Sequence, residues 1–345
     1  MKNMMKSFRK RVKDLPGVRR TYVYLRDLAF LRRHYKFGTK HSLLSLICAY
    51  NKAYRNEMHA QEFCYLRYMD LSEEERRQIV PWEEQFQFFI KVNPPEMREV
   101  TKDKYRAYEL FKEYYKREVI KLTGDVRRDE KAFLDFSRRN GKLIIKPMEA
   151  SKGTGIRIID AEALSDKELL DVLGQYNGEG VAEALIVQSD VVGAFHPKSV
   201  NTLRINTVRY DDEVVVKWPC FRVGRGDTEV DNAGAGGIFA AIDEKTGVTL
   251  KAADEYGNRY THHPDTNLSL IGFQIPEWDG ACEMVRCMAQ KLPGNRFIAW
   301  DLAYTDNGWV MVEGNALPLI IWQIAMCKGI REDFESMEKR LGLSV

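Results

Sequence analysis

The chain up to about residue 95 spaces its apolar positions as helices do. Residues 19–35 carry an apolar stripe at helical spacing, formed by Tyr24, Leu25, Leu28, Ala29 and Leu31. The stretch "LSEEERRQIVPWEE" offers a serine cap, a charged helix and a proline break. We therefore expect residues 1–95 to be helical, with the stripe packed on the rest of the protein and "NPPE" (93–96) closing the region.

A further helix and then a change of period follow. The stretch "TKDKYRAYELFKEYYKREVI" (101–120) predicts one helix capped at Thr101. Beyond it, short β-rich runs predict strands at 141–147, 153–160 and 181–188, with a helix at 165–176 between the last two. This alternation predicts a small α/β lobe.

The C-terminal half is also rich in strands. A long hairpin at 201–224 turns at "DD", a second at 236–250 turns at "EKTG", and a third covers 299–318. A helix is expected near 277–291, and a terminal helix at about 321–342. These elements predict a second lobe.

The pattern as a whole predicts an α+β protein with three domains. They are a helical, basic N-terminal region (1–95), a first lobe (96–190) and a second lobe with the terminal helix (191–345). Polar groups gather at strand ends in both lobes. We therefore expect a ligand site between the lobes, where binding clefts commonly form.

Composition narrows the class of protein. With 345 residues, 44% of them apolar and 30% charged, the chain has the composition of a soluble globular protein. Its six cysteines form no CxxC pair, which favours free thiols in a reducing compartment. No apolar run reaches the roughly 18 residues of a spanning helix, and no signal peptide follows the basic start. We expect a cytoplasmic protein.

Charge is spread unevenly along the chain. Residues 1–40 hold 13 Lys or Arg against Asp14 and Asp27, a local charge of +11, although the net charge of the whole chain is only +3. Such asymmetry favours an anionic partner for this arm: anionic lipid headgroups, a charged glycan or nucleic acid would all serve, and nucleic acid is the least expected of the three. It would allow peripheral attachment at the inner membrane face. A solvated helix face explains the charge equally well.

The third hairpin carries three oxygen ligands. Asp301 lies between Trp300 and Leu302 on one arm, while Glu313 and Asn315 share one face of the other arm. Pairing of the two arms brings the three side chains together, and such hard oxygen ligands suit Mg²⁺. Turn polarity alone explains Asp301 poorly, since this residue lies within a strand.

A glycine-rich loop, "SKGTG", joins two predicted strands. It matches neither a P-loop nor a dinucleotide fingerprint, because it opens no helix. Its backbone N–H groups, with donors from the side chains, suit phosphates, although a plain turn explains it as well. Lys146 lies in an apolar strand just before the loop, where it needs an anionic partner. Glu183 precedes another apolar strand and suits the amine of an adenine ring.

The order of these motifs resembles the ATP-grasp superfamily. Lys146, "SKGTG", "EALIVQ", "NTLRINTVR" and Asp301 with "VEGNALP" follow one another over about residues 100–330. The branch that the chain resembles most is the sugar-transfer-associated one, which is related to glutamate ligases. The resemblance implies an ATP-grasp fold of two α/β lobes clamping ATP, preceded by the helical region.

The resemblance also implies roles for single residues. Lys104 and Lys146 would contact ATP, and Ser151, Lys152, Gly153, Thr154 and Gly155 would close over its phosphates. Glu183 would bind the adenine amine, the backbone at Ala184 and Ile186 the ring edge, and Gln188 or Asp190 the ribose. Asp301, Glu313 and Asn315 would hold Mg²⁺, as two ions bridged by Glu313.

The implied reaction is carboxylate–amine ligation through an acyl-phosphate. Its substrates would be small acids and amines, such as an amino acid or a sugar-linked compound of surface polysaccharide or glycoconjugate biosynthesis. Arg204 and Arg222 are the expected catalytic arginines, because two anions must meet. Backbone N–H groups of Gly234, Gly236 and Gly237 would face a developing oxyanion.

One position departs from the family pattern. Many ligases of the superfamily carry an arginine two residues before the first metal aspartate, whereas this chain has Ala299. The departure leaves two alternatives open: a kinase that phosphorylates a sugar-like hydroxyl, and a non-catalytic anion-binding module. His196, His262 and His263 fall in predicted loops, where substrate contact and solvent exposure are both open.

Overall fold

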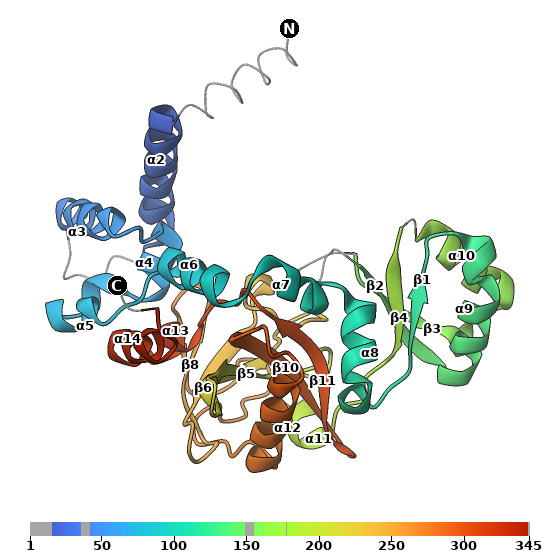
Figure 1. Cartoon of the computed structure of the whole chain (residues 1–345). Helices are drawn as coiled ribbons and strands as arrows, with labels where there is room; N and C mark the ends of the chain where they lie inside the picture. Colours follow the sequence, from blue (N-terminus) through green and yellow to red (C-terminus); the bar gives the residue numbers. More distant parts are fainter. Residues whose placement is uncertain (1–15, 36–41, 149–154, 177, 344–345) are drawn as a thin grey trace, which may run out of the picture. The chain divides into compact units, whose positions relative to one another are not determined.

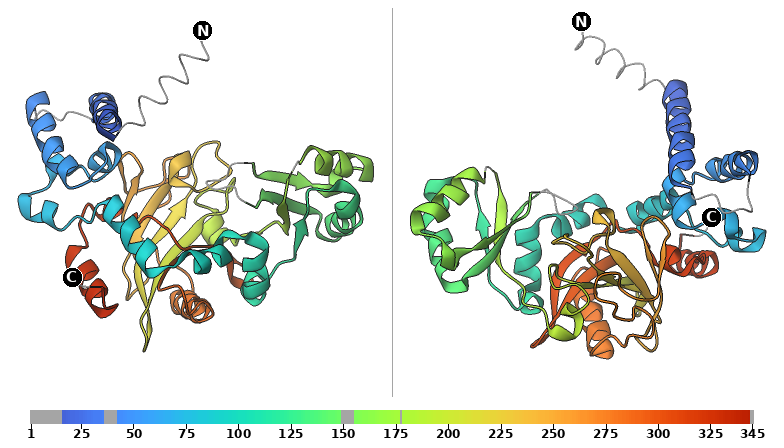
Figure 2. Two further views of the ribbon diagram at one scale, coloured as in Figure 1. Left: turned by 45° about the horizontal axis from the view of Figure 1, so that its top comes forward. Right: turned by 180° about the vertical axis from the view of Figure 1, so that it is seen from behind.

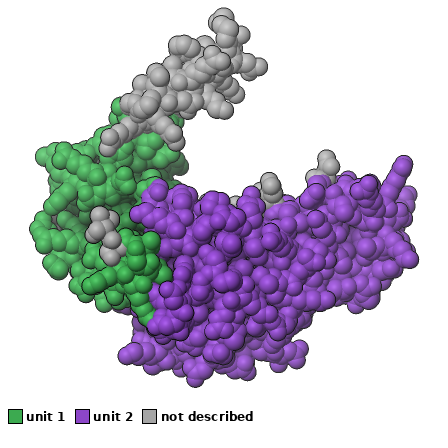
Figure 3. Space-filling model, in the orientation of Figure 1, with its two compact units in different colours: residues 1–85, 256–258, 327–345 green, residues 86–255, 259–326 purple. Residues whose placement is uncertain are grey.

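The computed structural model describes residues 16–35, 42–148, 155–176 and 178–343 (Figure 1). The chain forms two compact units, coloured separately in Figure 3. Unit 1 contains residues 1–85, 256–258 and 327–345, and unit 2 contains residues 86–255 and 259–326. The predicted division into domains 1–95, 96–190 and 191–345 stays a prediction.

Unit 1 is built from helices. They are α2 (Pro16–His34), α3 (Leu43–Arg55), α4 (Ala60–Tyr65), the 3-10 turn η1 (Tyr68–Asp70), α5 (Glu73–Arg77), the first turn of α6 (Trp82–Val92) and α14 (Arg331–Arg340). Aromatic residues fill its interior, where Tyr50 and Phe63 are fully buried. Ser72 caps α5 in a capping box with Glu75, and α6 begins just after Pro81, so the predicted cap and break are confirmed.

The apolar stripe of α2 is only partly buried. Leu31 is buried, but Leu25 and Ala29 are exposed. The expectation that the whole stripe packs on the protein is therefore wrong for these two positions. Among the described residues, no helix is long and apolar enough to cross a membrane.

The first sheet of unit 2 has four antiparallel strands in the order β1-β4-β2-β3. These strands are β1 (Val119–Leu122), β2 (Lys142–Pro147), β3 (Arg157–Asp160) and β4 (Gly180–Ala184). Helices α9 (Val126–Asn140) and α10 (Asp166–Gln175) cover one face, with the turn η2 (Ala161–Ala163) beside them (Figure 2). Leu143, Ile145 and Ala182 point into the core under these helices.

The second sheet has seven antiparallel strands in the order β11-β10-β5-β6-β7-β8-β9. The strands are β5 (Thr202–Arg209), β6 (Val214–Val223), β7 (Ile238–Ile242), β8 (Thr249–Asp254), β9 (Arg259–Tyr260), β10 (Phe297–Thr305) and β11 (Gly308–Asn315). The other elements of unit 2 are α7 (Pro95–Lys102), α8 (Lys104–Tyr115), α11 (Asp190–Gly193), η3 (Ala233–Ala235), α12 (Trp278–Gln290) and α13 (Trp322–Met326).

The apolar face of the seven-stranded sheet packs against α12. Trp300 and Leu302 of β10 point into this core, and Asp301 between them therefore points to the opposite face. The alternation of side chains along one strand thus presents the carboxylate away from the apolar core.

All three predicted C-terminal hairpins, the β2–β3 hairpin and the helices near 165–176 and 277–291 are confirmed. The predicted helix 101–120 is wrong at both ends. Asp103, not Thr101, caps α8 by accepting from the N–H groups of Tyr105 and Arg106, and the helix ends where Lys116 adopts a positive φ of 48°.

The predicted terminal helix 321–342 is two helices, α13 and α14. Cys327 adopts a positive φ of 51° between them. Gly329 follows, and a Cβ atom at this position would lie 1.9 Å from the carbonyl oxygen of Gln78. Close approach of the backbone to residue 78 therefore interrupts the helix that the apolar period predicts.

Candidate active site

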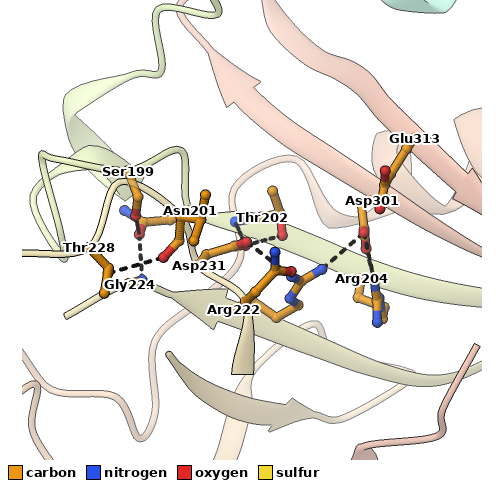
Figure 4. Close-up of polar contacts among 12 residues, drawn as sticks. Ser199, Asn201, Thr202, Arg204, Arg222, Gly224, Thr228, Asp231, Asp301 and Glu313 are labelled. Atoms are coloured by element: carbon orange, nitrogen blue, oxygen red, sulfur yellow. Dashed lines mark hydrogen bonds and ion pairs between the residues drawn. The ribbon is translucent and has the colours of Figure 1, made fainter. Parts of the chain in front are cut away.

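Asp301 lies at the centre of a buried polar network on the seven-stranded sheet. Arg204 on β5 is its cross-strand neighbour, and its Nε and Nη2 atoms donate to the two carboxylate oxygens at 2.7 and 2.6 Å. Arg222 on β6 adds a third bond from Nη1 at 2.9 Å (Figure 4). Burial disfavours the charged carboxylate, yet the two guanidiniums outweigh it and lower the pKa of Asp301 to about 2.

The network continues from Arg222 to Asp231. Arg222 Nη2 lies 3.0 Å from Asp231 Oδ1 and also donates to the side chain of Asn232. Asp231 in turn accepts from the backbone N–H and the hydroxyl of Thr202. Burial raises the pKa of Asp231, although Arg222 and Thr202 oppose this effect. Two buried carboxylates thus hold the two arginines in fixed positions.

A β-bulge places Glu313 beside Asp301. Leu302 pairs with Met311 but Asp301 pairs with Glu313, so Val312 is the extra residue. The bulge brings Glu313 to the face of Asp301, as Figure 4 shows, while Met311 stays in the apolar core. Asn315 lies on the same face, since its side-chain amide donates to Glu313 Oε1 at 3.0 Å.

These three residues fit a magnesium ion in part. Glu313 is exposed, and Asn315 keeps its amide oxygen, so both offer hard oxygen ligands. Both oxygens of Asp301 already accept from arginines, which leaves this residue fewer free lone pairs. Among the described residues, no group of three His, Cys, Asp or Glu side chains forms a metal cluster. Glu313 and Asn315 are therefore the ligands that the structure presents most openly.

A second ion-pair cluster lies on the four-stranded sheet, on the face opposite α9 and α10. Lys146 Nζ lies 3.0 Å from Glu183 Oε1, and Arg117 donates to Glu183 Oε2 from Nη2 at 2.7 Å. Glu183 is 3% exposed. Burial disfavours its charge, but Lys146 and Arg117 prevail and lower the pKa of Glu183 to about 2. Glu183 remains a carboxylate that two cations already contact.

Lys104, at the start of α8, lies near both clusters. Its Nζ donates to the carbonyl oxygens of Pro147 and Met148 at 2.8 and 2.9 Å. Burial lowers the pKa of Lys104, while the negative charges of Glu313 and Glu183 act in the opposite direction. The charges of Lys104 and Lys146 and those of Glu183 and Glu313 thus affect one another.

Of the other residues that were predicted to contact the nucleotide, some lie outside the described residues and others have partners within the chain. Ser151, Lys152, Gly153 and Thr154 lie outside the described residues, and Gly155 follows them at a positive φ of 76°. The N–H of Ala184 donates to the backbone carbonyl of Glu118, and Ile186 lies part-buried beyond β4. Gln188 bonds the backbone of Ser199 and Asn201 through both ends of its amide, so this side chain supports a loop.

Two of the three histidines that were considered for substrate contact are buried and have hydrogen-bond partners within the chain. His263 and His196 are buried, which rules out solvent exposure for these two, whereas His262 is exposed. His263 Nε2 donates to the Gly224 carbonyl at 2.7 Å, and His196 Nδ1 lies 2.9 Å from Ser199 Oγ.

The oxyanion role suggested for Gly236 and Gly237 is not supported, because their N–H groups donate to Ala233 and Asn232 within the loop. These two donors close the turn that follows η3. They are therefore already satisfied by the chain itself.

Sequence reasoning missed two residues of these clusters, Arg117 and Asp231. Arg117 lies within a stretch predicted as continuous helix, so its approach to a strand was hidden by the wrong helix end. Asp231 lies in a glycine-containing loop where an acidic residue is unremarkable. The contact between Arg222 and Asp231 depends on how the loop after β6 folds back, which local sequence does not show.

Comparison with known proteins gives the family context. The family model described as "Sugar-transfer associated ATP-grasp" matches residues 83–339. No match was found among curated proteins.

Among solved structures, the chain is similar to the ATP-grasp ligase PsnB complexed with minimal precursor, Mg and ADP. The TM-score is 0.44 at 14% identity, over 73% of this chain and 62% of that one. D-alanyl-alanine synthetase A from Vibrio cholerae O1 biovar eltor gives 0.44 at 9% identity, over 72% and 65%. The VanG D-Ala:D-Ser ligase from Enterococcus faecalis gives 0.45 at 17%, over 71% and 62%. The chain therefore spans less than two thirds of each of these proteins.

Proposed function

Because the chain belongs to the sugar-transfer-associated ATP-grasp family, we propose that it is an ATP- and Mg²⁺-dependent carboxylate–amine ligase. It would work through an acyl-phosphate and release ADP. Its substrates would be an amino acid or a sugar-linked acid and amine of surface polysaccharide or glycoconjugate biosynthesis. The cytoplasm is the expected location.

The observation that carries this proposal is the pair of arginines on Asp301. Arg204 and Arg222 reach it from two neighbouring strands, beside the exposed Glu313. A carboxylate substrate and a triphosphate repel each other, so fixed cations at their meeting point lower the barrier. Arg204 and Arg222 would thus take the part of the arginine that is missing at position 299.

The proposed chemistry has two steps. A carboxylate oxygen attacks the γ-phosphorus, the bond to the β–γ bridging oxygen breaks, and ADP leaves. The amine nitrogen then attacks the acyl carbon, loses a proton, and phosphate leaves. Lys104 and Lys146 would bind ATP, and Arg204 and Arg222 would orient the substrate carboxylate.

Glu313 and Asn315, with Asp301, would hold Mg²⁺. The family resemblance implies two such ions. A metal held there would supply positive charge to the phosphate oxygens. Glu183 would bind the adenine amine by a lone pair that Lys146 and Arg117 leave open. The loop 151–155 would cover the phosphates.

An ADP-release screen tests this function. Purified protein is incubated with ATP, Mg²⁺ and single amino acids, uronic acids or amino sugars, with hydroxylamine present to trap an acyl-phosphate. We expect hydroxamate and ADP with one class of acid. Lys146→Ala should lose activity by orders of magnitude, since each kcal/mol of transition-state stabilisation is about a fivefold change in rate.

The screen also separates the alternatives. A stable phosphorylated sugar without any need for an amine would replace the ligase with a kinase, the outcome that Ala299 allows. Full function of an Asp301→Ala/Glu313→Ala double variant would instead favour a non-catalytic module.

We propose further that the N-terminal helices attach the protein to an anionic phospholipid membrane. A groove of about 510 Å³ lies between α2 and α3, with Leu28, Leu31, Leu46 and Ile47 in it and Arg32 and Arg33 on the same lining. Leu25 and Leu44 are exposed nearby in sequence. Apolar side chains flanked by arginines match an acyl region beneath anionic headgroups, and the +11 charge of residues 1–40 adds attraction.

Vesicle sedimentation tests this attachment. The protein should pellet with phosphatidylglycerol-containing vesicles and stay in solution with pure phosphatidylcholine. An Arg32→Glu/Arg33→Glu variant should lose binding, whereas Arg127→Glu/Lys131→Glu in unit 2 should keep it. Equal binding to a charged glycan, or self-association through the groove, would contradict the membrane as the occupant.

A further inference from the structure

Arg117 contacts both the strand that carries the proposed adenine ligand and the strand that carries the proposed metal ligand. Its Nε and Nη2 atoms donate to Glu183 Oε2 at 3.1 and 2.7 Å, and its Nη1 donates to the carbonyl of Met311 at 2.6 Å. A further bond from Nη1 reaches the Tyr115 carbonyl at 3.2 Å, and the guanidinium lies 4.5 Å from the Tyr115 ring centroid. One side chain thus links β4, β11 and the end of α8.

Both side chains of this ion pair are buried. The side chain of Arg117 is 7% exposed and that of Glu183 is 4% exposed. An arginine buried to this degree requires partners for its charge and its N–H groups. The planar guanidinium can address a carboxylate on one edge and a carbonyl on the other, whereas a lysine ammonium is a single point of contact.

The two ends of this link are the two proposed ligand sites. Glu183 is the carboxylate expected to bind adenine. Met311 is followed by the bulged Val312 and then by Glu313, the exposed carboxylate expected to bind metal. The Met311 carbonyl is therefore fixed two residues before the metal ligand, on the strand whose bulge sets the direction of Glu313.

We propose that Arg117 is a positioning residue that couples nucleotide binding to metal binding. It keeps Glu183 oriented toward the adenine site and at the same time holds β11 in the register that presents Glu313. Binding of a nucleotide then favours the metal site, and metal binding favours the nucleotide by the same factor. This inference rests on the proposed function, because it requires that the chain bind ADP or ATP at these residues.

Calorimetric titration of the full chain with ADP measures the coupling directly. The dissociation constant is determined with saturating Mg²⁺ and with EDTA, and their ratio is the coupling factor. In the wild type we expect a factor well above one. Arg117→Met should weaken ADP binding by about tenfold or more, as loss of an outer-shell partner commonly does. It should also lower the coupling factor severalfold, to the level that direct contact between Mg²⁺ and the phosphate oxygens maintains without Arg117.

Two further variants make the result specific. Arg117→Lys keeps a positive charge beside Glu183 but cannot also reach Met311, so it should retain ADP affinity in EDTA and lose much of the coupling factor. Arg139→Met removes an exposed arginine that pairs with Glu118 in the same lobe, and it should change neither quantity.

The possible outcomes separate failure of the coupling role from failure of the proposed function. A wild-type chain that binds no ADP overturns the proposed function, and the coupling role falls with it. Wild-type affinity and coupling in Arg117→Met overturn the coupling role and leave the proposed function intact. If Arg117→Met does not fold, Arg117→Lys decides, since an unchanged coupling factor in this variant contradicts the proposal.

Discussion

At the scale of single residues, Asp301 shows how a buried carboxylate stays charged. It is 2% exposed, yet three guanidinium N–H groups donate to it. The pKa of about 2 lies below the unfolded value of about 3.9. The stability that this ion pairing contributes is therefore present above pH 4, and it is lost as the pH falls from about 4 toward 2.

Replacing Asp301 by asparagine tests this balance. Asp301→Asn removes the charge and leaves Arg204 and Arg222 without their shared partner, which should lower the free energy of unfolding by about 3–5 kcal/mol at pH 7. Urea unfolding measures the change. Asp227→Asn, which breaks a surface ion pair with Lys198, should leave the free energy of unfolding nearly unchanged. A similar small loss in both variants would show that the network is not a stabilising one.

The predictability of the site also differs from residue to residue. Asp301 was recognisable because a carboxylate between Trp300 and Leu302 has no structural reason in a strand. Arg204 and Arg222 could be proposed from the resemblance and the need for cations. That both would contact Asp301 could not be foreseen, because this depends on the pairing of β5 with β10 and of β6 with β5, which local sequence does not contain.

At the scale of elements, Gly329 lies in the break between α13 and α14, two residues after Cys327 with its positive φ. A Cβ atom on Gly329 would lie 1.9 and 2.0 Å from the carbonyl oxygen and carbon of Gln78. Gly329→Ala should therefore destabilise the protein by about 1–3 kcal/mol or more, as overpacking does. In contrast, Gly174→Ala in α10 meets no atom within 4 Å and should stabilise by up to about 1 kcal/mol. Thermal denaturation of the two variants checks the opposite signs, and a neutral Gly329→Ala would contradict the close approach.

The start of α6 depends on a buried acid. Glu62 in α4 accepts from the N–H of Trp82 at 2.9 Å, its other oxygen has no hydrogen-bond partner in the described residues, and burial raises the pKa of Glu62 to about 8. Because the folded pKa lies above the unfolded one, stability is full below about pH 4.5 and falls as the pH rises toward 8.

Glu62→Gln should abolish this loss, since a neutral amide can still accept from Trp82. The variant should be more stable than the wild type at pH 8 by a few kcal/mol, because each tenfold difference in proton affinity between the folded and unfolded states corresponds to about 1.4 kcal/mol. Urea midpoints at pH 5 and pH 8 measure the difference. Parallel pH profiles of the two proteins would show that Glu62 is charged in the folded state.

Elements of the fold were predictable to different degrees for physical reasons. The hairpins have turn residues between alternating strands, and the capping serines lie before their helices, so local sequence specified them. The order of the strands in both sheets, the bulge at Val312 and the ends of α8 depend on partners distant in sequence. Local sequence therefore could not specify them.

At the scale of the whole molecule, the excess positive charge and the family match lie in different parts of the chain. The family model begins at residue 83, close to the end of the first segment of unit 1. The excess of positive charge lies before this point, within residues 1–40, whereas both ion-pair clusters lie in unit 2. Under the proposed function, the nucleotide site therefore belongs to unit 2 and the basic segment to unit 1.

Hydrogen exchange measured by mass spectrometry tests this assignment. Addition of ADP with Mg²⁺ should slow amide exchange in unit 2, in peptides that contain Lys104, Lys146, Glu183 and Glu313, because a bound ligand suppresses local opening by mass action. Peptides from α2 and α3 should exchange at unchanged rates. Anionic vesicles should give the reverse pattern, with slower exchange in α2 and α3 only. Protection of unit 1 by the nucleotide would place the nucleotide site outside the clusters described above, and the two roles would no longer belong to separate units.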